Sequence, residues 1–303
     1  MNLRDLHYFH VLTETKHFGE AAKRCFVSQP TLSMQIKKLE ETLGITLFER
    51  TNKQVLVTDE GASLLPLVKK ILMLVDELKQ VASHSLDPFS GELRLGVIPT
   101  LAPYLLPLIM PSIKDHFPDL KIWLIEEQTH QLVSKLEAGE LDAALMAEPK
   151  ISTFTHQLLF EEPFYFTCAK NNPLANSLAI SLADLVNQHV MLLEEGHCLR
   201  EQAMAICQLA NATDVADFTA TSLETLRLMV QSEMGVTLLP ALAVITNPSN
   251  LLCYIPFDRP KPSRRISLFW RSASPKAICL LAIAELIKQI AMINGLSISP
   301  PKN

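Results

Sequence analysis

The sequence contains few cysteines and starts without an apolar segment, and both features exclude classes of protein. Six cysteines in 303 residues are too few for a small secreted scaffold held together by disulfides. Met1 is followed by Asn2-Leu3-Arg4-Asp5, which does not resemble the apolar core of a secretory signal. We therefore expect a cytoplasmic protein whose thiols are normally reduced.

Long uninterrupted apolar runs are also missing. Two uncharged stretches, 95–113 and 234–257, approach the ~20 residues that a membrane-spanning helix needs. Four prolines interrupt the first stretch, and Gly235, Pro240 and the turn at 247–250 interrupt the second. The sequence therefore predicts no membrane span.

Charge of either sign is limited, and its distribution divides the chain. The formal net charge is -5, and all of it lies in residues 89–303, because 1–62 and 63–88 are each neutral. With 48% hydrophobic residues, the chain can fill cores, and its length suits two or three domains. We expect an N-terminal domain over 1–62, a connecting helix over 63–88 and a regulatory domain over 89–303.

The N-terminal residues carry the signals of a helix-turn-helix followed by a two-stranded wing. Apolar residues at helical spacing predict helices over 3–12 and 18–25. Ser28 is suited to cap a third helix over 31–43, Pro30 to its first turn, and Gly44 to its end. Short strands are expected at 45–48 and 55–57 around a basic turn.

The third helix and the wing supply side chains suited to DNA. Gln can bond adenine in the major groove, while Ser and Thr offer a hydroxyl, and basic residues on a wing suit phosphates. Because 1–62 is neutral, an ordinary solvated helix stays an alternative. The candidates are Gln29, Pro30, Thr31, Ser33, Gln35, Lys37 and Lys38 on the helix, and Arg50, Asn52 and Lys53 on the wing.

A heptad pattern in the connecting segment indicates helix pairing. Leu64, Ile71 and Leu78 recur every seven residues, with Val68, Val75 and Ala82 between them. The alternative is a helix that packs only on its own domain. Pro66 inside this segment is expected to kink the helix or to remove a hydrogen bond.

Residues 89–303 alternate between strands and helices. This alternation predicts a parallel sheet with helices on both faces, and the length suggests two such lobes. Thr100 and Thr129 each follow a strand and open a helix, at the sheet edge where ligands bind. Simple helix capping is the alternative for both.

Residues 3–62 resemble the winged helix-turn-helix of LysR-type transcriptional regulators. The resemblance rests on 21–22, on Ser28-Gln29-Pro30-Thr31-Leu32-Ser33, on 35–40, on Leu47-Phe48-Glu49-Arg50 and on 58–61. The order of wing, linker helix and two-lobed domain resembling a periplasmic binding protein also matches. The resemblance implies promoter DNA as a partner, a dimerising linker helix and a homodimer or homotetramer.

Cys198 and Cys207 form the most informative cysteine pair. Cys198 opens a predicted helix over 198–210 beside His197 and near Arg200, a setting that favours the thiolate, although Glu194 and Glu195 oppose it. In one helix, nine residues separate the two cysteines by ~13 Å along the axis and turn them to opposite faces. A disulfide needs Cα atoms within roughly 7 Å, so this bond would require the helix to melt or refold.

The segment 196–204 with Cys207, together with 98–100, 129–131, 220–227 and 237–243, is similar to peroxide-sensing members of the LysR family. That similarity implies that hydrogen peroxide oxidises Cys198 to a sulfenic acid, which Cys207 resolves to a disulfide. It also implies a peroxide site of Thr100, Thr129, His197 and Arg265, and activation of antioxidant genes through RNA polymerase. No cofactor or metal is expected, and Cys25, Cys168, Cys253 and Cys279 are expected to be inert.

Three other functions stay open at this point. One is a LysR-type regulator that binds a small organic acid near Thr100 and Thr129, and another is a thiol peroxidase, although the DNA-binding segment counts against it. A metal site at His7, His10, His17 and Cys25 is the weakest, because the spacing matches no common metal motif.

Overall fold

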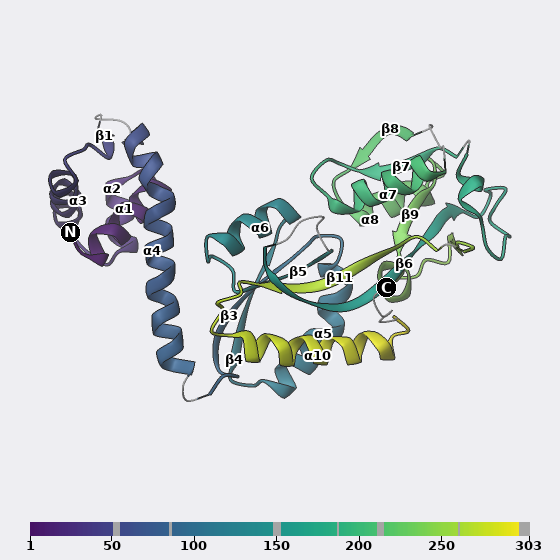
Figure 1. Cartoon of the computed structure of the whole chain (residues 1–303). Helices are drawn as coiled ribbons and strands as arrows, with labels where there is room; N and C mark the ends of the chain where they lie inside the picture. Colours follow the sequence, from purple (N-terminus) through teal and green to yellow (C-terminus); the bar gives the residue numbers. More distant parts are fainter. Residues whose placement is uncertain are drawn as a thin grey trace. The chain divides into compact units, whose positions relative to one another are not determined.

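The structure, a computed structural model, describes residues 1–50, 55–84, 87–147, 153–186, 188–210, 215–259 and 261–296. The chain divides by its contacts into two units, Met1–Ser85 and Leu86–Asn303, and each is described by itself. Figure 1 labels most of the helices and strands of both units. The expected boundaries at 62/63 and 88/89 stay predictions.

The first unit contains the predicted helices and wing. Its elements are α1 (Leu3–Thr15), α2 (Phe18–Arg24), α3 (Gln29–Leu43), β1 (Phe48–Arg50), β2 (Val55–Val57) and α4 (Asp59–His84). The strands pair antiparallel, with Phe48 opposite Val57. The first strand was expected at 45–48 but begins at Phe48, because the Ile45 N–H bonds the Glu40 carbonyl and the Thr46 carbonyl accepts from Thr58.

Side-chain caps and a small core fix these helices. The side chains of Asn2, His17 and Ser28 each accept a backbone N–H at the start of α1, α2 and α3, and Gly44 ends α3 in the left-handed region. The Phe9 and Phe48 rings pack 5.5 Å apart and join α1 to the wing. The predicted caps at Ser28 and Gly44 are confirmed.

Helix α4 presents apolar residues in two directions. Val68 is buried and Leu64 packs against the core of the first unit. The side chains of Leu67, Ile71, Leu74 and Leu78 are 40–70% exposed, at the spacing of a helix-pairing seam. Pro66 lies within α4, and the described helix continues past it to His84.

The first lobe of the second unit surrounds a parallel core. It contains β3 (Gly91–Val97), α5 (Ala102–His116), β4 (Leu120–Glu126), α6 (Thr129–Glu137), β5 (Ala143–Ala147) and α10 (Ala277–Ile293). Strand β3 pairs in parallel with β4 on one side and β5 on the other. Every residue of β5 is buried, which explains why its sequence is apolar throughout.

The second lobe contains the cysteines of greatest interest. Its elements are η1 (Leu182–Leu185), β7 (Val190–Leu193), α7 (Cys198–Leu209), β8 (Val215–Ala220), α8 (Leu223–Gln231), β9 (Thr237–Pro240), α9 (Ala241–Thr246) and β10 (Leu252–Pro256). Strands β7 and β8 are parallel, and β9 and β10 pair antiparallel with the long strand β6 (Thr155–Ala169).

Two long strands, β6 (Thr155–Ala169) and β11 (Ser263–Trp270), connect the lobes (Figure 1). The first half of β6 pairs with β11, and its second half pairs with β9 and β10. Because one strand leaves the first lobe and the other returns to it, the two run antiparallel. The expectation of an all-parallel sheet is therefore wrong: the sheet is mixed, whereas the expected two-lobed α/β architecture is confirmed.

The two uncharged stretches fold as parts of these lobes. Residues 95–113 include the end of β3 and most of α5, and 234–257 include β9, α9 and β10. No helix within the described part of the chain combines the length and apolar character of a membrane span.

Candidate functional site

Helix α3 exposes most of the residues that the sequence assigned to DNA. Gln29, Pro30, Thr31 and Lys37 are exposed, whereas Ser33 and Gln35 are half-buried. The exposed face also includes Met34, which sequence reasoning missed although thymine methyl groups favour apolar contacts. Asn52 and Lys53 lie outside the described residues, as does the side chain of Arg50.

Glu40 ties this helix to the wing. Its Oε1 accepts the backbone N–H groups of Leu47 at 2.9 Å and Phe48 at 3.2 Å. A carboxylate that accepts two N–H groups makes the stronger, charge-assisted kind of hydrogen bond. The wing therefore holds a fixed position relative to α3 within the first unit.

In the second unit, Arg264 lies against Thr100 at the junction of the lobes. The buried guanidinium donates to the Thr100 hydroxyl at 3.0 Å and to its carbonyl at 3.2 Å. The same group forms a 2.6 Å ion pair with Glu162, which in turn accepts the Leu242 N–H at 2.9 Å. Arg264 therefore links Thr100 to Glu162 and, through that carboxylate, to the Leu242 N–H.

The resemblance assigns Arg265 to the peroxide site, whereas the arginine that bonds Thr100 in the structure is its neighbour Arg264. Arg264 is buried opposite Glu162, and Arg265 is exposed opposite Glu161. Successive residues of a strand point to opposite faces, so the one-residue difference moves the guanidinium from the junction to the surface.

Neither threonine caps a helix through its side chain. Helix α5 is capped at Leu101 and α6 at Gln128. The Thr129 hydroxyl is buried and has no hydrogen-bond partner within the described residues. An orphaned buried hydroxyl can donate to or accept from a small polar ligand, which simple capping does not explain.

A cavity of about 470 Å³ opens between the lobes of the second unit. Its lining includes His197 and four carboxylates, whereas Cys198 is not among the described residues that form its wall. No lysine or arginine of the described residues lines it. The lining residues are Pro99, Pro103, Tyr104, Glu126, Glu127, Gln128, Gln131, Glu194, His197, Thr221, Ser222, Leu223 and Glu224.

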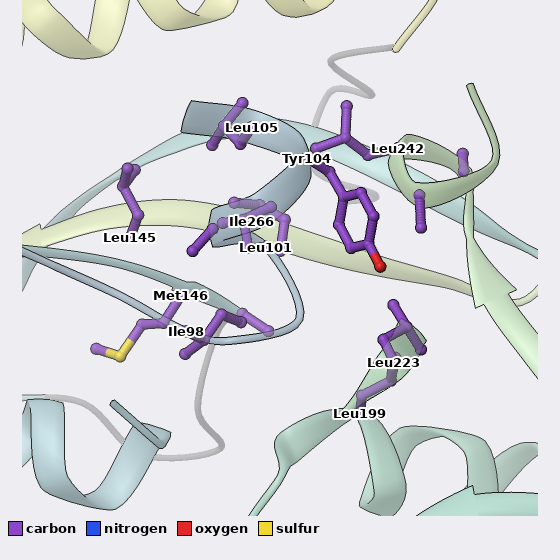
Figure 2. Close-up of a cluster of buried hydrophobic side chains, with 14 of the residues drawn as sticks. Ile98, Leu101, Tyr104, Leu105, Leu145, Met146, Leu199, Leu223, Leu242 and Ile266 are labelled. Carbon is purple, nitrogen blue, oxygen red and sulfur yellow. The ribbon is translucent and has the colours of Figure 1, made fainter. Parts of the chain in front are cut away.

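Tyr104 joins the lobes at the floor of this cavity. Figure 2 shows its ring beside Leu242 and its hydroxyl directed toward Leu223. The hydroxyl donates to Glu224 Oε1 at 2.7 Å, and Arg227 pairs with the other oxygen at 2.6 Å. Although burial raises the pKa of Glu224, these bonds from Tyr104 and Arg227 lower it below its ordinary value. No local pattern predicts this contact, because 120 positions separate the two residues.

The loop before α7 positions Cys198. Gly196 has φ +94°, in the left-handed region that favours glycine, and the buried His197 occupies the cap position. Cys198 is half-buried at the first residue of the helix. Arg200, predicted to favour its thiolate, donates to the Leu193 carbonyl at 2.6 Å.

Cys207 lies nine residues further along the same helix. It is 2% exposed, and burial raises the pKa of its thiol, so it stays protonated at neutral pH. Both cysteines are free. The predicted helix is confirmed, and its rise separates the pair by ~13 Å along the axis.

The N-terminal histidines have local roles. His17 accepts the Glu20 N–H at 3.1 Å as the cap of α2, and His10 lies 3.7 Å from Glu14. No group of three or more His, Cys, Asp or Glu residues suited to a metal occurs among the residues that the structure describes.

Family models match nearly the whole chain. Residues 3–62 match "Bacterial regulatory helix-turn-helix protein, lysR family", and residues 87–291 match "LysR substrate binding domain". The hydrogen peroxide-inducible genes activator of Pectobacterium carotovorum subsp. carotovorum is 46% identical over 291 residues, which cover 95% of this chain and 96% of that protein. The DNA-binding transcriptional dual regulator OxyR of Escherichia coli K12 is 45% identical over 290 residues and 95% of each chain.

Solved structures agree with these matches. A full-length OxyR variant from Pseudomonas aeruginosa superposes with a TM-score of 0.81 at 32% identity and covers 99% of both chains. The reduced form of an OxyR, at 42% identity, covers 68% of this chain and 98% of its own, with a TM-score of 0.63. The chain therefore belongs to the LysR family of bacterial transcriptional regulators, in the group that holds OxyR and the hydrogen peroxide-inducible genes activators.

Proposed function

We propose that this chain is a DNA-binding transcriptional activator that senses hydrogen peroxide through Cys198 and Cys207. The Cys198 thiolate attacks one peroxide oxygen, which breaks the O–O bond and yields a sulfenic acid and hydroxide. The Cys207 thiol then attacks that sulfur, forms the disulfide and releases water. Two electrons pass from the dithiol to one peroxide molecule.

One observation carries the proposal: two free thiols lie at different turns of one ordered helix. The ~13 Å rise between them exceeds the ~7 Å that a disulfide permits between Cα atoms. Disulfide formation therefore requires α7 to unwind, and the Leu199, Ala203 and Ile206 side chains to leave their buried positions. The chemical event and the change of shape are the same event.

The peroxide site is proposed around the junction of the lobes. The orphaned Thr129 hydroxyl, the Thr100 hydroxyl held by Arg264, and His197 beside Cys198 supply small polar groups suited to a neutral ligand. Arg264 holds Thr100 at this site, and the contribution of Arg265 that the resemblance implies stays a prediction.

The charge of the cavity argues against an organic-acid effector. Glu126, Glu127, Glu194 and Glu224 line it; Lys135 pairs with Glu127 at 2.9 Å and Arg227 with Glu224 at 2.6 Å, so Glu126 and Glu194 carry the excess negative charge. Carboxylates repel an anionic ligand in a partly enclosed space, whereas uncharged hydrogen peroxide meets no such barrier. The proposed effector is therefore the peroxide.

The partners follow from the two units. Promoter DNA is proposed to bind the exposed face of α3 and the wing in the cytoplasm. The exposed row of Leu67, Ile71, Leu74 and Leu78 supports pairing of two α4 helices in a homodimer, from which a homotetramer assembles. Contact with RNA polymerase is proposed by analogy with the family, and peroxide acts as a signal rather than as the substrate of an enzyme.

A thiol map before and after one equivalent of hydrogen peroxide tests the proposal. We expect a disulfide that joins Cys198 and Cys207 in the wild-type chain, sulfenic acid at Cys198 in Cys207→Ser, and no peroxide-dependent transcription with Cys198→Ser. Cys279→Ser, at another buried cysteine, is the matched control. An unchanged transcriptional response in Cys198→Ser would contradict the proposal, and repeated turnover with a reductant would instead favour a thiol peroxidase.

A further inference from the structure

A second pair of cysteines lies side by side in the second lobe. Cys168, near the end of β6, is directly opposite Cys253 in β10, and the antiparallel register is regular from Leu252 opposite Ala169 to Pro256 opposite Tyr165. Opposed residues of an antiparallel pair project to the same face, with Cβ atoms about 4.5–5.5 Å apart. Both thiols are free.

The backbone at this pair already suits a disulfide. Directly opposed Cα atoms in an antiparallel ladder are about 4.5 to 5.5 Å apart, and disulfides occur at Cα separations of about 4.4–6.8 Å. Closing this bond therefore needs side-chain rotation and a small approach of the strands. The pair in α7, in contrast, needs a helix to unwind.

The two thiols differ in access. Cys168 is fully buried, whereas Cys253 is half-buried and reachable by a small oxidant. Burial, followed by the neighbouring Cys253, raises the pKa of Cys168 to about 11. Cys168 is therefore the buried, protonated partner of the more accessible Cys253 thiol.

We propose that Cys168 and Cys253 form a second oxidisable dithiol, which a hydroperoxide converts to a cross-strand disulfide. The Cys253 sulfur attacks the peroxide, which breaks the O–O bond and leaves a sulfenic acid and water. The Cys168 sulfur then displaces the hydroxyl group, and a second water leaves with the thiol proton. The oxidant is the one in the proposed function, but the reaction uses neither Cys198 nor Cys207.

The position of the bond gives it a structural effect. Strand β10 is the end strand of its sheet, and β6 continues from the second lobe into the first. The disulfide would fasten that end strand to the strand that connects the lobes. It would close a loop from residue 168 to residue 253, which contains α7, so the borders of the lobe would be fixed while α7 refolds.

The test uses the full-length chain with Cys198→Ser and Cys207→Ser, treated with hydrogen peroxide. Alkylation of the remaining thiols, followed by digestion without reductant, is expected to yield a linked peptide pair that contains Cys168 and Cys253. Its mass should be two hydrogens below the sum of the two peptides. The melting temperature of the treated protein is expected to rise by several degrees, because the loop is closed in the unfolded chain as well.

Matched variants separate this reaction from general oxidation. Adding Cys253→Ser, at the more accessible position, should abolish both the linked peptide and the rise in melting temperature, whereas adding Cys279→Ser should preserve both. The buried partner is tested with Cys168→Ser. If that variant fails to fold, Cys168→Ala removes the thiol without burying a hydroxyl. Alkylation of both cysteines after peroxide treatment, or over-oxidation of Cys253 beside an intact Cys168 thiol, would overturn the proposal. Because the variant lacks both α7 thiols, failure of the proposed peroxide switch leaves this result unaffected.

Discussion

Gly196 lies directly against Gln128 across the junction of the two lobes. A Cβ atom built on Gly196 would lie 2.2 Å from Gln128 Oε1, and the φ of +94° at Gly196 is one that other residues rarely adopt. The positive φ defines the conformation of the loop that positions Cys198, and the end of the Gln128 side chain of the other lobe lies against it. The absence of a side chain at position 196 is what permits this close approach.

Gly196→Ala is expected to slow the oxidation of Cys198 roughly tenfold or more, because the displaced loop moves the thiol relative to the groups around it. The measurement is the rate of loss of the Cys198 thiol under excess peroxide. Gly44→Ala is the control: its φ is also positive, at +71°, but nothing lies within 4 Å of the added Cβ. Equal oxidation rates in the two variants would show that the Gly196 contact does not position the thiol.

Lys37→Ala is expected to weaken DNA binding by a similar factor on every sequence. Lys37 is exposed on α3, and its ion pair with Glu41 is long, at 3.9 Å, and solvent-exposed. Loss of one phosphate contact should reduce the slope of log affinity against log salt by about 0.9. Titrations of operator DNA at several salt concentrations measure the slope. Lys170→Ala, in the second unit, should leave it unchanged, and an unaltered slope in Lys37→Ala would exclude a phosphate contact there.

Asp142 is expected to make the second unit sensitive to acid. It accepts the Arg94 N–H at 2.7 Å and pairs with Lys276 at 2.9 Å. Burial raises its pKa, but Lys276 and Arg94 outweigh this and lower the pKa below its ordinary value. The stabilisation is therefore complete above the pKa of an unfolded aspartate and is lost as the pH falls through the depressed value.

Asp142→Asn should destabilise the second unit at neutral pH by about 3–5 kcal/mol, because it leaves the buried Lys276 ammonium unpaired. The dependence of stability on pH below about 4 should flatten at the same time. Urea unfolding at a series of pH values measures both effects. The control is Asp76→Asn, which removes an exposed partner of Lys79. If the pH dependence of Asp142→Asn matched that of the wild type, another carboxylate would have to account for it.

Leu74→Glu and Leu78→Glu are expected to convert the assembled protein to smaller species. Both side chains are more than half exposed on α4, so a charge costs little in the isolated chain but opposes pairing of apolar seams. Sedimentation velocity measures the change in mass. Leu178→Glu, at a residue that is 95% exposed in the second unit, should leave the mass unchanged. An unchanged mass in the α4 variants would locate self-association elsewhere.

The sequence predicted the features that local signals encode. Ser28, Pro30 and Gly44 mark the limits of α3 within a few residues, and the rise of one helix separates Cys198 from Cys207. Features that depend on tertiary pairing were not accessible in the same way. Arg264 and Arg265 are adjacent in the sequence and differ only in the face of β11 on which they lie. Strand β11 runs antiparallel to β6 because one strand leaves the first lobe and the other re-enters it. The sequence of neither strand indicates this direction.

Contacts between distant segments gave no signal in the sequence. Tyr104 and Glu224 meet only because two lobes close on each other, and Cys168 meets Cys253 only through the register of β6 with β10. The positive φ of a glycine in a turn is a local feature, so it can be predicted from the sequence. Even so, the neighbour that excludes a side chain at Gly196 is identified only by the fold.

The glutamate-lined cavity between the lobes has a consequence for selectivity among oxidants. A hydroperoxide that bears a carboxylate, or any other anionic oxidant, would be repelled in this cavity by Glu126 and Glu194, because Lys135 and Arg227 pair only with Glu127 and Glu224. The smallest uncharged oxidant would enter without that cost. The charge of the cavity would thus select among oxidants before any reaction. The extent of thiol oxidation would then reflect the concentration of the uncharged oxidant alone.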